Sequence, residues 1–187
     1  FGCGGNVDLQ PEVADEVQFS ARFSLAERHT LHLDLYRNDI DQLIEFDVTS
    51  FTLQNINTAE LRGAQLGWAY TGELFDARVD VISQSAENAA DGSRLLRRPE
   101  RSMTVNLRRR IGEHALGLSL LASGDREDLS STLPGYMLLN LTGQFTLGQN
   151  WQTNIRIENL LDKQYQTAAP YRMSERGAFV ELKYRWK

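Results

Sequence analysis

The chain has 187 residues, of which 41% are hydrophobic and 24% are charged, and this balance excludes an intrinsically disordered polypeptide. No run of about eighteen apolar residues occurs, which excludes a transmembrane helix but not a membrane β-barrel, whose alternating strands average to polar. The formal net charge of −5 argues against nucleic acid as a partner.

Apolar and polar residues alternate with a period of two along almost the whole chain, a pattern that is typical of β-strands with two unlike faces. Val17 and Phe19, for example, alternate with Gln18 and Ser20. The pattern predicts nine strands, at residues 13–25, 30–40, 59–71, 74–85, 101–109, 114–122, 135–147, 151–160 and 177–187. We therefore expect an all-β protein whose antiparallel strands follow one another up and down.

The connections between the predicted strands alternate strictly between short and long. Short turns are predicted at residues 26–29, 71–73, 110–113 and 148–150, and most of them carry the glycine that tight hairpins favour. Long connections are predicted at residues 41–58, 86–100, 123–134 and 161–176. One end of the sheet should then carry tight turns and the other large loops, which is the arrangement of outer-membrane β-barrels.

Large aromatic residues also gather at one end of the predicted strands, near the short turns and the C-terminus. They are Trp68, Tyr70, Phe75, Phe145, Trp151, Tyr184 and Trp186. Such a belt is typical of a membrane interface, where an amphipathic ring is half solvated. The polar strand faces carry many arginine and carboxylate side chains, which favours a wet lumen inside and lipid against the apolar faces. A soluble barrel capped by aromatic residues is the alternative.

The odd number of strands indicates part of a larger barrel, because bacterial single-chain barrels have even numbers. If the last strand ends at the turn side, the first begins at the loop side, and residues 1–11 are the tail of a long surface loop. We therefore expect that residues 1–187 do not close into a barrel by themselves. Strands 13–25 and 177–187 should not pair with each other.

Several segments resemble those of one protein family. Residues 157–165 read Ile-Glu-Asn-Leu-Leu-Asp-Lys-Gln-Tyr, which resembles the penultimate-strand signature of TonB-dependent outer-membrane receptors, with Leu161 in place of the usual phenylalanine. Residues 5–12 resemble a segment that opens a mid-barrel strand in that family, with Val7 in place of proline, and residues 57–65 resemble a third stretch. Residues 95–99 (Leu-Leu-Arg-Arg-Pro) resemble a loop segment of the vitamin B12 (cobalamin) receptors within the family.

The resemblance implies a transmembrane β-barrel of about 22 strands in the bacterial outer membrane, of which residues 1–187 form the C-terminal part. It implies that a plug domain and the TonB box lie upstream, outside this chain. The implied function is uptake of a scarce nutrient, with cobalamin as the first candidate, driven by the inner-membrane TonB complex. An iron–siderophore receptor is the alternative within the family. A passive porin-like barrel and a soluble β binding module are alternatives from other classes.

No enzyme chemistry is indicated by the sequence. The three histidines lack the spacing of a zinc site, and no nucleophile elbow or phosphate-binding glycine loop occurs. His32 and Asp34 share a predicted strand face and are expected to form a hydrogen-bonded pair in the lumen. We expect no metal or cofactor in this chain, although upstream loops could bind calcium. Cys3, the single cysteine, is expected to form a disulfide with an upstream cysteine, with a free thiol as the alternative.

The long loops hold the residues most suited to contact a ligand. Arg94, Arg97 and Arg98 cluster in the loop 86–100, and arginine offers a fixed fork of donors for amide or phosphate groups of a polar ligand. The resemblance to cobalamin receptors makes Arg97 the leading candidate. In the last loop, Tyr165 and Tyr171 supply flat contact area. Contact of these loops with lipopolysaccharide is the alternative role.

Overall fold

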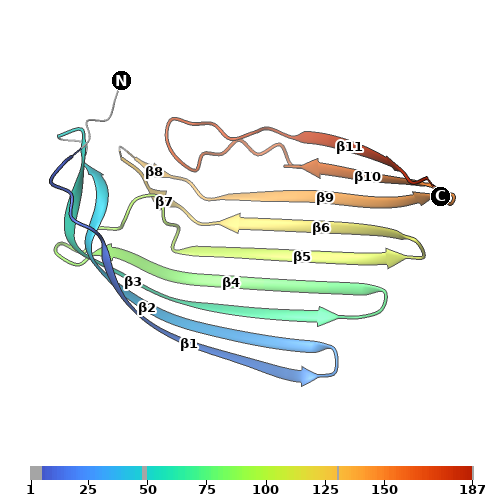
Figure 1. Ribbon diagram of the computed structural model, residues 1–187, viewed down its shortest axis with the longest axis horizontal. Helices are drawn as coiled ribbons and strands as arrows, with labels where there is room; N and C mark the ends of the chain where they lie inside the picture. The colour runs from blue at the N-terminus through green and yellow to red at the C-terminus, as the bar shows by residue number, and fades with distance from the viewer. Residues whose placement is uncertain (1–5, 48–49, 130, 187) are drawn as a thin grey trace.

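The computed structural model of the chain describes residues 6–47, 50–129 and 131–186. One nine-stranded antiparallel sheet dominates the fold, and a small two-stranded insert accompanies it (Figure 1). The strands of the sheet are β1 (Val13–Ala26), β2 (His29–Asp47), β3 (Thr52–Thr71), β4 (Phe75–Asn88), β5 (Arg101–Ile111), β6 (His114–Ser123), β9 (Tyr136–Leu147), β10 (Trp151–Glu158) and β11 (Gly177–Tyr184), and the insert is β7 (Arg126–Glu127) and β8 (Thr132–Leu133). The predicted all-β, up-and-down order is confirmed. No helix in the described part of the chain is long and apolar enough to cross a membrane.

The connection expected at residues 41–58 is not a long loop, and this prediction was wrong. Strands β2 and β3 continue as a paired hairpin as far as Asp47 and Thr52. The alternation that predicts a strand is interrupted at Gln42 and Leu43, although the pairing with β3 keeps the same register on both sides of Gln42, whose φ is 59°. Beyond it, Leu43 is buried against Ala59 and Leu95, so the hairpin extension is anchored by apolar contact.

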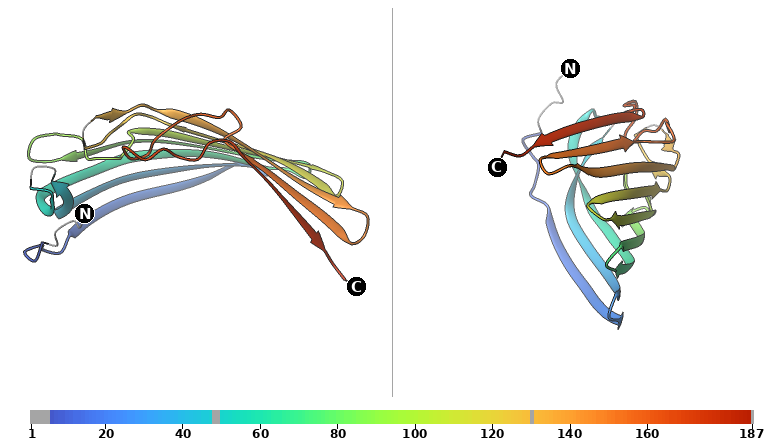
Figure 2. Two further views of the ribbon diagram at one scale, coloured as in Figure 1. Left: turned by 90° about the horizontal axis from the view of Figure 1, so that it is seen from above. Right: turned by 90° about the vertical axis from the view of Figure 1, so that its right-hand side faces the viewer.

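The sheet is open and curved. Figure 2 shows a twisted trough in which β1 and β11 form the two edges. No ladder joins these two strands within residues 6–47, 50–129 and 131–186. The prediction that the two outer strands do not pair with each other is confirmed. Each edge strand therefore presents one side of its backbone without a strand partner.

The sheet lacks the apolar core of a soluble domain. The buried hydrophobic cluster is small and lies at the loop end, around Ala59 and Ala86. The apolar face of the sheet is instead exposed: Val17, Phe19, Phe23, Leu25, Leu35, Leu66, Val81, Val180 and Leu182 all have more than a third of their surface accessible. The polar face is hollowed, and Arg78, Asn106 and Ser119 line a depression of 990 Å³ on it. The two unlike faces predicted from the alternation are present.

The polar face contains a cross-strand contact that differs from the one expected. His32 does not pair with Asp34; its Nε2 lies 3.0 Å from Oδ1 of Asp80 on β4, while Asp34 accepts a hydrogen bond from Ser20. The register places Gly67 of β3 between His32 and Asp80. Because Gly67 has no side chain, the imidazole lies across it and reaches the second strand away.

The aromatic residues do gather at the short-turn end. His29 contacts Trp68 and Tyr70, with ring centroids 5.8 and 4.9 Å apart. At the other side of the sheet, Tyr184 packs between Trp151 and Trp186 at 4.7 and 5.0 Å. Rings from neighbouring strands therefore form contiguous groups at this end of the sheet.

Candidate functional site

Three loops meet at the end of the sheet opposite the short turns (Figure 1). They join β4 to β5 (residues 89–100), β6 to β9 (residues 124–135) and β10 to β11 (residues 159–176), and the insert of β7 and β8 lies in the second. All five candidate ligand residues lie in the first and third of these loops: Arg94, Arg97, Arg98, Tyr165 and Tyr171. The second loop lies between the other two along the sheet and contacts both.

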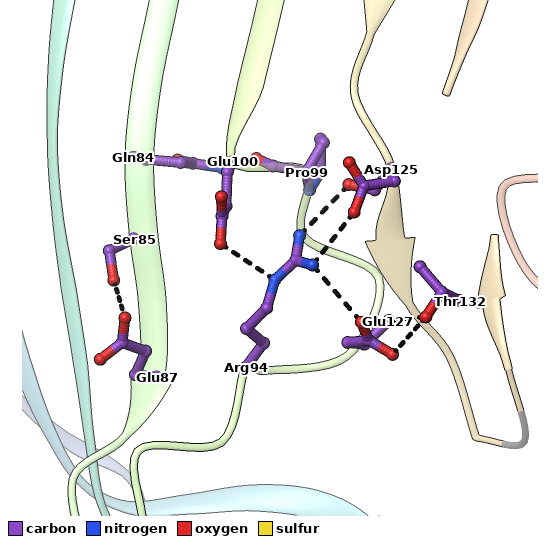
Figure 3. A network of polar contacts seen from close by, with 9 residues as sticks. All are labelled: Gln84, Ser85, Glu87, Arg94, Pro99, Glu100, Asp125, Glu127 and Thr132. Atoms are coloured by element: carbon purple, nitrogen blue, oxygen red, sulfur yellow. Dashed lines mark hydrogen bonds and ion pairs between the residues drawn. The ribbon is translucent and has the colours of Figure 1, made fainter. Parts of the chain in front are cut away.

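Arg94 holds the first loop to the second (Figure 3). Its guanidinium lies 3.1 Å from Glu100, 3.1 Å from Asp125 and 3.4 Å from Glu127. Glu127 also accepts a hydrogen bond from the hydroxyl of Thr132, within the insert. Arg94 is therefore the centre of an ion-pair network, and its donors are already directed to protein carboxylates.

Arg97 is also engaged by the second loop. Its backbone N–H donates to the carbonyl of Glu127 at 2.7 Å, and its Nε donates to Oδ1 of Asp128 at 3.0 Å. The residue has a φ of 61°, a left-handed conformation in which this pair of contacts holds it. The side chain stays 45% exposed, and its one hydrogen bond to another described residue is the one from Nε.

Asp128 connects all three loops. Its side chain is 1% exposed and accepts hydrogen bonds from the N–H of Leu129 at 2.8 Å and of Ala169, in the third loop, at 2.5 Å. Burial alone would raise the pKa of this carboxyl, but the two backbone donors and the Arg97 guanidinium outweigh it. The pKa of Asp128 is therefore held below its ordinary value of 3.8.

Arg98, Tyr165 and Tyr171 differ in how they are held. Arg98 is half-buried, and no hydrogen bond or ion pair joins its side chain to another described residue. Tyr165 packs against Tyr136 of β9, with ring centroids 4.4 Å apart. Tyr171 is 71% exposed and lies outside this aromatic contact. The structure thus brings the arginines and Tyr165 to one end of the sheet without placing them in a single cluster.

In the segment 157–165, the Asn and Asp side chains form hydrogen bonds that hold the third loop. Asn159 is 5% exposed and has a φ of 49°. Its side chain accepts from the N–H of Lys163 and donates to the carbonyls of Lys163 and Ser174, so it bridges the two ends of the third loop. Asp162 accepts from the N–H of Arg176 at 2.9 Å. The Asn and Asp of this motif therefore close the loop that carries Tyr165 and Tyr171.

A groove of 540 Å³ runs between the tip of the β2–β3 hairpin and the first two loops. Phe46, Leu96 and Leu129 line its apolar part, and Glu45 and Glu127 contribute carboxylates. Such a mixed lining suits a ligand that is partly apolar and partly polar. No three His, Cys, Asp or Glu side chains converge as a metal site would need in the described part of the chain.

Sequence reasoning missed three residues that shape this end: Arg126, Asp128 and Tyr136. The first two lie in the charged run at residues 125–128, which is typical of an exposed loop and gives no local signal of burial. Yet Arg126 and Asp128 are only 5% and 6% exposed. Cys3 lies outside the described residues, so its disulfide stays a prediction.

Comparison with known proteins gives one family model. The model for "TonB dependent receptor-like, beta-barrel" matches residues 1–160. Among curated proteins, the Vitamin B12 transporter BtuB of Vibrio vulnificus (strain YJ016) is 27% identical over 195 residues, which cover 97% of this chain and 31% of the relative. BtuB of Photobacterium profundum is 27% identical over 198 residues, which cover 97% of this chain and 32% of that relative. The chain thus spans about a third of the length of these relatives.

Solved structures share the fold at lower identity. The Copper transporter OprC superposes with a TM-score of 0.80 at 15% identity, covering 95% of this chain and 32% of that protein. The ferripyoverdine receptor of Pseudomonas aeruginosa, bound to ferripyoverdine, superposes with a TM-score of 0.76 at 11% identity, covering 94% and 27%. At these identities the likeness concerns the fold alone.

Proposed function

This chain belongs to the TonB-dependent receptor-like β-barrel family, and we propose that it is part of an outer-membrane receptor for active uptake of a scarce nutrient. The family is one of transport receptors. In this proposal the apolar face of the sheet contacts lipid, the hollowed polar face lines the lumen, and the aromatic residues of the short-turn end lie at the membrane interface. The three loops at the other end face the outside of the cell.

The observation that carries the proposal is the exposed apolar face of an open sheet. Leu66 and Val81 lie on strands inside the sheet, yet they are 55% and 44% exposed. In water such a face would favour aggregation, whereas in a bilayer it is the surface that lipid requires. Unpaired strand edges cannot face hydrocarbon, so further strands of the receptor should pair with β1 and β11. In this proposal residues 1–187 form part of the barrel wall, and the remaining strands, a plug domain and the TonB box belong to parts of the receptor outside these residues.

Cobalamin is the ligand that we propose first. The curated relatives over 97% of this chain carry the name Vitamin B12 transporter, and residues 95–99 resemble the corresponding receptors. Arg97, Arg94, Arg98, Tyr165 and Tyr171 are the proposed ligand contacts. Among them Arg98 has a side chain without a partner among the described residues, and the side chain of Arg97 is 45% exposed and hydrogen-bonded to a described residue only through Nε. A ferric siderophore is the second candidate, because the fold is shared with siderophore receptors.

Equilibrium binding to the detergent-solubilised full-length receptor separates these candidates. We expect labelled cyanocobalamin to bind and a ferric catecholate not to compete. Replacing Arg97 or Arg98 by alanine should weaken binding by roughly 1.5–3 kcal/mol if either donates to the ligand. Binding of the siderophore instead would assign the second candidate. Unchanged affinity in both variants would show that these arginines do not contact the ligand, which leaves them a role in loop structure or in contact with lipopolysaccharide.

Two further measurements separate the other classes. A passive porin-like barrel would conduct ions steadily in a planar bilayer, whereas a plugged receptor should not. A soluble β binding module would stay folded without detergent, whereas we expect the receptor to precipitate when detergent is removed. Steady conductance, or folding without detergent, would contradict the proposal.

A further inference from the structure

Arg126 is a buried cation that lacks an acidic partner among the described residues. It begins β7, is 5% exposed, and donates one hydrogen bond, from Nη2 to the hydroxyl of Ser123 at 2.7 Å. Its Nε is buried and has no acceptor within residues 6–47, 50–129 and 131–186. A buried guanidinium with a single neutral acceptor is costly, because its lost hydration is not replaced.

The carboxylates nearest to Arg126 in the sequence are bound by other arginines. Asp125 and Glu127 pair with Arg94, and Asp128 pairs with Arg97. No ion pair joins Arg126 to a carboxylate in the part of the chain that the structure describes. The loop thus contains enough acidic residues to neutralise Arg126, but these residues pair with Arg94 and Arg97 instead.

One aromatic ring lies against the guanidinium, and a second ring packs against the first. The guanidinium carbon of Arg126 lies 5.0 Å from the ring centroid of Tyr136, and the ring centroids of Tyr136 and Tyr165 are 4.4 Å apart. The cation–π contact offsets part of the burial cost but supplies no acceptor for the free N–H groups. In the ladder, Ser123 is paired with Tyr136, and both belong to the polar face of the sheet at its loop end. The group therefore lies on the polar face of the sheet, at its loop end.

We propose that Arg126, Tyr136 and Tyr165 form a binding site for an anionic group, a carboxylate or a phosphate, and that an attached flat ring packs against the tyrosines. A carboxylate or phosphate matches the fork of the guanidinium and supplies the missing charge. This inference rests on the proposed function, since it assumes that the loop end captures a ligand. The anion can come from a ligand in solution or from an acidic side chain elsewhere in the receptor.

Phenyl phosphate is a suitable probe, because it joins a phosphate to a flat ring. We would measure its binding to the full-length receptor in detergent and phosphate-free buffer by calorimetry, together with the melting temperature. The test variant is Arg126→Met, which keeps the length of the side chain without the charge. The matched control is Arg101→Met, an exposed arginine at the same end of the sheet without an ion pair to another described residue.

If the anion comes from solution, the receptor should bind phenyl phosphate, Arg126→Met should weaken that binding at least tenfold, and Arg101→Met should not. If it comes from the receptor, phenyl phosphate should not bind, and Arg126→Met should lower the melting temperature because it leaves a buried carboxylate unpaired. Equal binding by Arg126→Met and the parent receptor would overturn the proposal. So would an absence of binding together with an unchanged or raised melting temperature, and normal nutrient uptake would then leave the proposed function standing.

Discussion

Nε of Arg97 lies 3.0 Å from Oδ1 of Asp128, although 31 residues separate them in the sequence. The same carboxylate accepts the N–H of Ala169, a further 41 residues along. One buried side chain therefore ties together the three loops that carry all the proposed ligand contacts. Their mutual position is set by this carboxylate as well as by the sheet beneath them.

Replacing Asp128 by alanine should loosen the third loop. The change leaves the N–H groups of Leu129 and Ala169 without their acceptor, which costs roughly 1–3 kcal/mol of local stability. Amide hydrogen exchange over residues 161–176 should accelerate by the corresponding factor. Asp125→Ala is the control, because Asp125 is 59% exposed and its pair with Arg94 is screened by solvent. Equal exchange in the two variants would show that Asp128 does not hold the loops.

The hydrogen bonds and the ion pair of the Asp128 carboxylate should weaken in acid. The pKa of Asp128 is lowered in the folded state, so the carboxylate contributes its full stabilisation above the unfolded pKa of 3.8 and loses it as the pH falls through the lower folded pKa. Pepsin cleavage of the third loop, divided at each pH by the cleavage of an unstructured peptide that reports the activity of the protease itself, should therefore increase below about pH 4. Asp128→Asn should abolish this dependence. A loop that opens equally with pH in both proteins would contradict the assignment.

Gly67 is expected to tolerate no side chain while His32 is present. A Cβ at Gly67 would lie 1.7 Å from Cε1 of His32, so Gly67→Ala must displace the imidazole from Asp80. We expect a loss of roughly 1–3 kcal/mol in the free energy of unfolding. In a His32→Ala background the same glycine substitution should cost much less, because the space above Gly67 is then open. A cost that is equal in both backgrounds would show that the ring is not the obstacle.

The two faces of the sheet should respond differently to a new charge. Leu66→Arg, on the apolar face, should destabilise the receptor in a bilayer by about 2–4 kcal/mol, since it places a cation against hydrocarbon. Ser119→Arg, on the hollowed polar face between Asn106 and Asn140, should be tolerated better. Unfolding by urea from lipid vesicles measures both. If Ser119→Arg destabilised the receptor more than Leu66→Arg, the assignment of the apolar face to lipid and the polar face to the lumen would be wrong.

Local alternation predicts most of the sheet, because a strand with two unlike environments must place apolar residues at every second position. The pattern fails at Gln42 and Leu43, which interrupt the alternation without changing the register, and the hairpin extension that Leu43 anchors is therefore not predicted. The loop arginines are recognisable because they are adjacent in the sequence. Their partners Asp125, Glu127 and Asp128 are not, since these carboxylates come from another loop and no local pattern records such a pairing.

Arg126 is a second residue whose surroundings could not be predicted from the sequence. In a run of four charged residues it has the appearance of a solvated loop residue, yet it is 5% exposed and lies over Tyr136. Only the arrangement of the neighbouring carboxylates around Arg94 and Arg97 reveals that it has no counter-ion among the described residues.

Accumulation of labelled cyanocobalamin in living cells tests the central claim most directly. The full-length receptor would be expressed as the only outer-membrane route for cobalamin, in cells with and without a functional TonB protein. We expect binding at the cell surface in both strains and accumulation inside only when TonB is present. Accumulation that does not depend on TonB, or a receptor that neither binds nor accumulates any nutrient tested, would contradict the account.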